Sequence, residues 1–173
     1  MGISEAILRH GYVWEAEIPS DQTRGRFVPE TAEMLSEAGW FPGRDVFSEL
    51  RLPTGFSLFP AAQRVLQEFG MLRIGREGPG LMSARTPVVL DPMLCVGEDD
   101  RFSAYASLHH SCLYPLGEAS GGHAFVAIDE QGRVFGLMDA MWFVGDTFDD
   151  ALDNLLRGAR RSPIIYETGN WQT

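Results

Sequence analysis

Two stretches in the first half of the chain carry apolar residues at helical spacing. Between residues 29 and 38 the apolar positions recur at i, i+3, i+4 and i+7, which predicts a helix with one buried face. A second helix is predicted over residues 57–69. A glycine follows each segment, as is typical of a helix C-terminus. The two stripes consist of Thr31, Met34, Leu35 and Ala38, and of Ala62, Val65, Leu66 and Phe69.

The first of these helices ends in a corner whose residue types are informative. Gly39 supplies the left-handed conformation that ends a helix, and Pro42-Gly43 forms a tight turn. Trp40 lies between them and is expected in the core, as are Trp142 and Phe143. None of these residues indicates catalysis. We interpret the corner and the end of the second helix as one architectural motif, formed by Gly39, Trp40, Pro42, Gly43, Arg44, Glu68, Phe69 and Gly70.

The second half of the chain is dominated by segments typical of strands. Residues 124–128 have the alternation of a strand that is apolar on both faces, and residues 134–138 are predicted to be the second strand of a hairpin. Gly132 suits the positive φ of the turn between them. Thr147 is the predicted N-cap of a further helix, which Gly158 ends. Residues 101–112 are ambiguous and favour a helix. A loop is expected at 75–80, and extended segments at 45–52, 71–74, 87–90, 113–116, 141–144 and 164–166.

Helices and hairpins are mixed without regular βαβ alternation, which predicts an α+β fold. We expect a single domain over residues 26–161, with a central antiparallel sheet and helices packed around it. Residues 1–25 are interpreted as an N-terminal extension, in which residues 4–10 could form a short helix. Residues 162–173 are interpreted as a C-terminal extension that could add a strand.

Composition limits the partners. The chain has 173 residues, of which 45% are hydrophobic, so it can bury a full core without a metal or disulfide. Its formal net charge of −10 disfavours nucleic acid and anionic membrane surfaces, because both need clustered cations. A protein partner with a basic surface would be attracted. The alternative is that the acidity only keeps the protein soluble.

Cysteine content and the absence of a long apolar run bear on the compartment. Cys95 and Cys112 are the only two cysteines, and no secretory signal or membrane-spanning segment is visible. We therefore expect a cytoplasmic protein with both thiols free, although the sequence alone leaves a disulfide open.

One group of residues raises the possibility of chemistry. His109, His110 and Cys112 lie close together in sequence, with Cys95 and His123 as distant partners. The spacing does not fit a zinc site, and the simpler interpretation is a histidine at a helix end and a packed thiol. No catalytic residue, metal or cofactor is expected. A small enzyme or ligand-binding protein that uses this region remains the alternative.

Carboxylates gather in two places. The order needed for a calcium loop is absent, so we interpret the first cluster as a solvated loop and the second as capping of a helix N-terminus. Either cluster could meet a basic partner. Residues 75–80 are rich in glycine but do not form a phosphate loop, because Pro79 removes an amide donor. The two acidic clusters are Glu98, Asp99 and Asp100, and Asp146, Asp149 and Asp150.

The order of these features resembles the third family of the SUKH superfamily, which consists mostly of bacterial immunity proteins related to fungal cell-wall-assembly regulators. The resemblance covers residues 26–158. Two positions depart from the family pattern, because Met71 replaces a frequent second glycine and Val28 stands where a Ser or Thr cap is usual. The matching features are the corner, Leu66-Gln67-Glu68-Phe69-Gly70, Leu90-Asp91-Pro92, Leu113-Tyr114-Pro115-Leu116-Gly117, the hairpin turn from Ile128 to Val134, and Gly145 before Ala151-Leu152.

The resemblance implies a non-catalytic immunity protein that binds and neutralises a cognate toxin of a polymorphic toxin system. Toxins paired with such proteins include nucleases and nucleic-acid deaminases, whose substrate-binding surfaces are basic. The acidic clusters are then candidates for toxin binding, and the corner is left with a structural role. A regulatory scaffold like the fungal relatives is a further alternative. The oligomeric state is left open.

Overall fold

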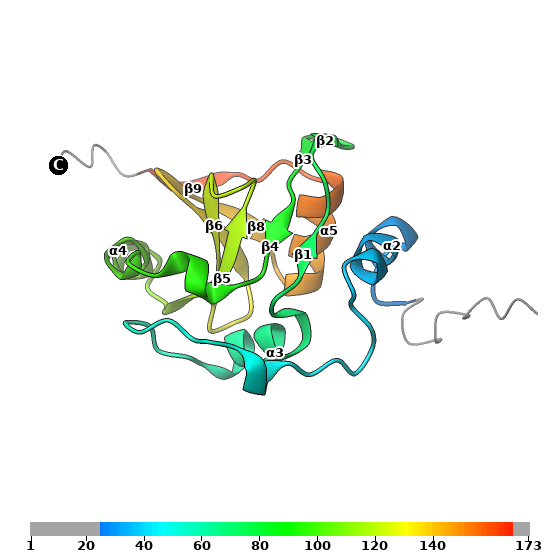
Figure 1. Cartoon of the computed structure of the whole chain (residues 1–173). Coiled ribbons are helices and arrows are strands. Elements are labelled where there is room, and N and C mark those ends of the chain that lie inside the picture. Colours follow the sequence, from blue (N-terminus) through cyan, green and yellow to red (C-terminus); the bar gives the residue numbers. More distant parts are fainter. Residues whose placement is uncertain (1–24, 168–173) are drawn as a thin grey trace, which may run out of the picture.

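The computed structural model of the chain describes residues 25–167 and shows an α+β domain (Figure 1). A seven-stranded antiparallel sheet has the order β1-β4-β5-β6-β7-β8-β9, and β2 and β3 form a separate ribbon. The predicted fold class is therefore confirmed. The strands are β1 (Arg73–Ile74), β2 (Gly78–Pro79), β3 (Ala84–Arg85), β4 (Val88–Val89), β5 (Leu113–Ala119), β6 (Ala124–Asp129), β7 (Val134–Leu137), β8 (Ala140–Gly145) and β9 (Ile164–Glu167).

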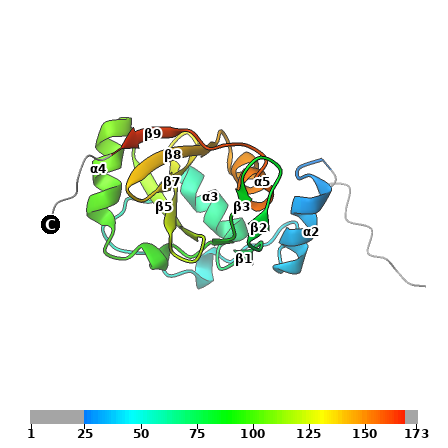
Figure 2. The same cartoon turned by 90° about the horizontal axis from the view of Figure 1, so that it is seen from above.

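Helices cover both faces of the sheet. Alternation along β6 sends Val126 and Ile128 into one core cluster and Ala127 into a second cluster on the other face. Helices α2 (Pro29–Glu37), α3 (Pro60–Phe69) and α5 (Phe148–Arg157) supply the first cluster. Helix α4 (Asp99–His109) supplies the second and lies on the opposite side of the sheet from α5 (Figures 1 and 2).

Proline and glycine set the helix boundaries. Helix α2 begins at Pro29 as predicted, whereas α3 begins at Pro60, three residues later than expected. Both prolines lie in the first turn, where a missing N–H group is tolerated. Thr147 accepts a hydrogen bond from the Asp150 amide at 3.2 Å, so the predicted cap of α5 is confirmed.

The extended segment predicted at residues 45–52 is wrong. A 3-10 turn, Phe47–Glu49, interrupts it. The Asp45 carboxylate accepts a hydrogen bond from the Phe47 amide at 3.1 Å, which is the side-chain turn that aspartate favours. Apolar spacing alone does not reveal this polar contact.

The end of the described chain joins the sheet. Strand β9 pairs antiparallel with β8 and forms one edge of the sheet, so the strand expected in the C-terminal extension is present. The short helix expected at residues 4–10 lies outside the described residues.

Candidate binding surfaces

The Trp40 corner is packed from three aromatic rings. The Trp40 indole stacks on Phe69 with ring centroids 6.0 Å apart and planes at 4°. The ring of Phe27 meets both edge-on, at 5.6 and 6.3 Å. Trp40 is only 7% exposed, which confirms that it belongs to the core. Gly39 and Gly43 have φ values of 91° and 82°, as the predicted helix end and turn require.

Glu68 joins the corner to the second helix. Its Oε1 accepts hydrogen bonds from Trp40 Nε1 at 3.1 Å and from Arg26 Nη1 at 2.6 Å. The Arg26 guanidinium also contacts both carboxylate oxygens of Asp149, at 2.6 and 2.9 Å. The bond to Asp149 is the largest cause that raises the pKa of Arg26 far above its usual range, and burial opposes it. The corner, α3 and the start of α5 are thus one ion-paired unit.

Arg44 completes this unit through the main chain. Its guanidinium donates hydrogen bonds to the carbonyl oxygens of Glu68 and Gly70, at 2.7 and 2.8 Å. These oxygens belong to the C-terminal end of α3, which lacks intrahelical donors. Burial lowers the pKa of Arg44. The sequence predicted both halves of the motif but not the bonds that join them.

The second acidic cluster lies beside the corner. Asp149 is held by Arg26, and Asp146 is exposed at the wall of a shallow hollow of about 320 Å³. A second hollow of about 400 Å³ shares Arg26, Arg64 and Glu68 with the first. Within residues 25–167, the carboxylates of Asp146 and Asp150 form no ion pair.

The first acidic cluster is elsewhere. Glu98, Asp99 and Asp100 lie at the start of α4, which covers the other face of the sheet. Glu98 is paired with Arg101 at 2.7 Å. The six carboxylates therefore form two separate surfaces and not one continuous patch.

The histidines and cysteines are not brought together. His109 Nε2 lies 3.2 Å from the buried Asp129 carboxylate, at one end of β6, whereas His123 precedes the other end. A six-residue strand separates them by about 20 Å. No group of three metal-binding side chains occurs within residues 25–167. His109 belongs to the network of the hairpin turn, where Arg133 Nε also donates to Asp129 at 2.8 Å.

Both cysteines are free thiols, and they differ in environment. Cys95 is fully buried, and burial raises the pKa of its thiol to about 12. Cys112 is exposed. Cys95 is therefore a packed thiol without thiolate character at neutral pH, whereas Cys112, the thiol next to the histidines in sequence, is not packed.

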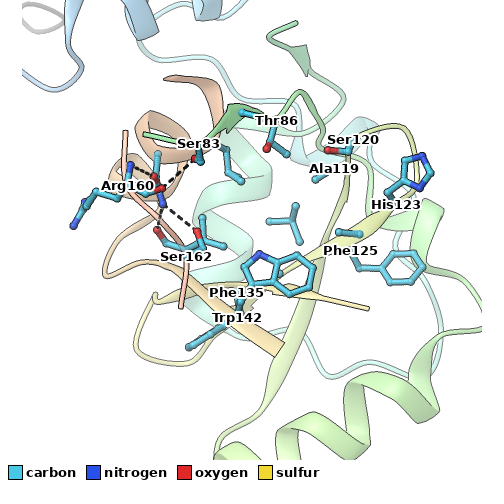
Figure 3. A pocket seen from close by; sticks show the side chains of 17 residues that line it. Ser83, Thr86, Ala119, Ser120, His123, Phe125, Phe135, Trp142, Arg160 and Ser162 are labelled. Carbon is cyan, nitrogen blue, oxygen red and sulfur yellow. Dashed lines mark hydrogen bonds between the residues drawn. The ribbon is translucent and has the colours of Figure 1, made fainter. Parts of the chain in front are cut away.

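A pocket of about 370 Å³ was not predicted from the sequence (Figure 3). It lies between the residues around β3, the faces of β6 to β8 and the C-terminal end of α5. The Trp142 indole lies against Gly136, where an added Cβ would come within 2.2 Å of the ring. Trp142 packs on the core, as expected, but it is only partly buried and also lines the pocket. The position of Trp142 in the predicted strand did not indicate that it would line a pocket.

The fold and these surfaces define an α+β protein with a seven-stranded antiparallel sheet, whose charged and apolar surface groups lie around the two ends of α5 and the start of α4. The model of the SUKH-3 immunity protein family matches residues 27–158, so the chain belongs to this family. The predicted resemblance is confirmed. Comparison with curated proteins and with solved structures found no match. None of the helices within residues 25–167 is long and apolar enough to cross a membrane.

Proposed function

We propose that this immunity protein neutralises a toxin of the nuclease or nucleic-acid deaminase class in the cytoplasm, and that it meets the toxin with the acidic surface at the start of α5. The observation that carries the proposal is that, among the described residues, the carboxylates of Asp146 and Asp150 form no ion pair, beside a corner that is itself ion-paired. Enzymes that act on nucleic acids carry basic surfaces, because their substrates are polyanions.

Rigidity of this surface supports the proposal. Asp146, Thr147 and Asp150 lie at the capped N-terminus of α5, and Arg26 ties the same turn to α3 through Asp149 and Glu68. Carboxylates on a fixed frame lose little conformational freedom when a partner binds. The net charge of −10 adds a long-range attraction to a basic toxin, which raises the association rate.

The first experiment asks whether a toxin exists. The chain is co-expressed with the product of the neighbouring toxin-like gene, and growth and direct binding are measured. We expect growth to be restored and binding to weaken as salt rises, because exposed charges are screened. If no such product binds and growth is not restored, the immunity role of this chain is refuted.

The second experiment asks which surface is used. Asp146→Asn/Asp150→Asn should slow toxin association about 3–10-fold at low salt and less at high salt. Asp99→Asn/Asp100→Asn is the matched control, since it removes the same charge from the start of a helix on the opposite face. If the control slows association and the α5 variant does not, the toxin binds the other face.

A further inference from the structure

The loop between β2 and β3 is fixed to the C-terminal end of α5. The amides of Leu81 and Met82 donate to the carbonyl oxygens of Arg157 and Gly158, at 2.9 and 2.7 Å. The amide of Ser83 also donates to Gly158, at 3.2 Å. The loop thus supplies donors to helix carbonyls that have none of their own, and it is held rigidly by them.

Two glycines permit this close approach. A Cβ at Gly80 would come within 2.3 Å of the Ser83 carbonyl oxygen, and a Cβ at Gly158 within 2.1 Å of the same atom. Neither position can accept a side chain without moving backbone. Gly158 also has a φ of 59°, as expected for the residue that ends a helix.

This rigid loop exposes two apolar side chains. Leu81 is 64% exposed and Met82 is 63% exposed, the two highest values among the large hydrophobic residues described. Most of each side chain therefore contributes nothing to the core. Apolar side chains that are exposed on a pre-ordered backbone bind a partner with a smaller entropic cost than side chains on a mobile loop.

The pocket described above opens beside this loop. Ser83 lies in its wall, directly after Met82 in the chain, and Trp142 forms an aromatic surface inside it (Figure 3). Ile164 pairs with Trp142 across β8 and β9, so the two side chains share a face of the sheet. Ile164 is 58% exposed. The exposed loop, the pocket and the edge strand together offer apolar surface around one hollow.

Two hydroxyl groups of the pocket are available to a partner, whereas the side chains of Ser83, Asn154 and Ser162 are hydrogen-bonded within the domain. The hydroxyls of Thr86 and Ser120 line it and form no hydrogen bond with other residues in the 25–167 range. Among its described lining residues, only Arg160 and His123 can carry charge and none is a carboxylate, although the chain is strongly acidic. In Figure 3 the Arg160 side chain extends outward from the rim.

We propose that Leu81, Met82 and this pocket form the apolar anchor of the toxin interface. The pocket would take an apolar side chain of the toxin, and Arg160 would meet a carboxylate beside it. A volume of about 370 Å³ suits one large side chain with room to spare. This inference rests on the proposed function, and it adds a second contact at the opposite end of α5 from Asp146 and Asp150.

The two ends of α5 lie within reach of one partner. Ten helical residues span about 15 Å, and a standard interface buries about 800 Å² on each partner. Carboxylates at one end and an arginine at the other would orient the toxin, because the reversed pose places like charges together.

The test uses the full chain and the toxin-like product of the neighbouring gene, with the dissociation constant and heat capacity change measured by calorimetry. Met82→Asp should weaken binding about 100-fold and make the negative heat capacity change smaller. Val96→Asp is the matched control, because Val96 is 58% exposed but follows a turn next to α4. It should change the affinity less than about 3-fold. Arg160→Gln should weaken binding about 5-fold.

The outcomes separate the two proposals. If the wild-type chain does not bind, the proposed function itself fails. If it binds and Met82→Asp behaves like Val96→Asp, the toxin interface does not include the loop and the anchor is refuted. If Arg160→Gln binds like the wild type, the proposed contact between Arg160 and a carboxylate of the toxin is refuted. All three substituted side chains are exposed, so the melting temperatures of the variants should match that of the wild type.

Discussion

The two ends of α5 differ in the side chains that neighbouring segments place around them. At the N-terminal end, Arg26 is ion-paired with both Glu68 and Asp149, and Trp40 is hydrogen-bonded and buried. At the C-terminal end the main chain is equally well bonded, but Leu81 and Met82 project into solvent. Bonding of the backbone sets the shape in both places. The difference is that the side chains around the N-terminal end are bonded or buried within the domain, whereas Leu81 and Met82 are exposed.

This comparison suggests how a family motif should be interpreted. The corner is the most recognisable part of the sequence, yet its tryptophan and arginines find their partners inside the molecule. Among the described residues, Asp146 and Asp150 beside it form no ion pair and Leu81 and Met82 at the far end of α5 are exposed, and these are the residues that we propose for the partner. Family membership therefore follows from the scaffold, and we place the choice of toxin in the surface around it.

The largest effect should come from Trp40→Ala. Removing a stacked indole that is 7% exposed should lower the free energy of unfolding by about 3–5 kcal/mol. Urea denaturation of both proteins measures this. The variant should still bind toxin in conditions where it stays folded. An unchanged midpoint would mean that the corner is not part of the core and does not stabilise the domain.

Arg44→Ala should lower the free energy of unfolding by less, about 1–3 kcal/mol, because two charged hydrogen bonds to the end of α3 are lost. Arg51→Ala is the matched control, since Arg51 is exposed and forms no hydrogen bond with other described residues. Equal stabilities for the two variants would show that Arg44 does not hold the helix end.

The smallest effect concerns Met71, one of the departures from the family pattern. Its φ of 67° is left-handed, and a glycine adopts this conformation without steric cost. Met71→Gly should therefore raise the free energy of unfolding by up to about 1 kcal/mol. Met71 is 53% exposed, so little packing is lost. A drop in stability would show that the methionine side chain contributes more than its backbone costs.

The sequence predicted most elements because their signals are local. Apolar spacing found the helices, Thr147 and Gly158 bounded α5, and Gly132 marked the hairpin turn with its φ of 90°. It placed the start of α3 too early, since residues 57–59 share its apolar composition. The turn at 47–49 was missed because it is held by backbone hydrogen bonds and by the Asp45 carboxylate, which leave no pattern of apolar residues.

The candidate surfaces were harder to predict, because they depend on contacts between distant parts of the chain. Arg26 is separated from Glu68 by 42 positions and from Asp149 by 123. The sequence around α5 does not indicate that Asp149 is ion-paired while its neighbour Asp150, within the described residues, is not. Leu81 and Met82 resemble core residues in composition, and only the bonds to the end of α5 explain why they are exposed.

The most direct test of this account measures toxin affinity and melting temperature on the same two variants, Arg44→Ala and Met82→Asp. We expect Arg44→Ala to lower the melting temperature and keep the dissociation constant within about 3-fold, and Met82→Asp to weaken binding about 100-fold at an unchanged melting temperature. If the folded Arg44 variant binds far more weakly, or Met82→Asp binds as tightly as the wild type, the division between a scaffold and a binding end is contradicted.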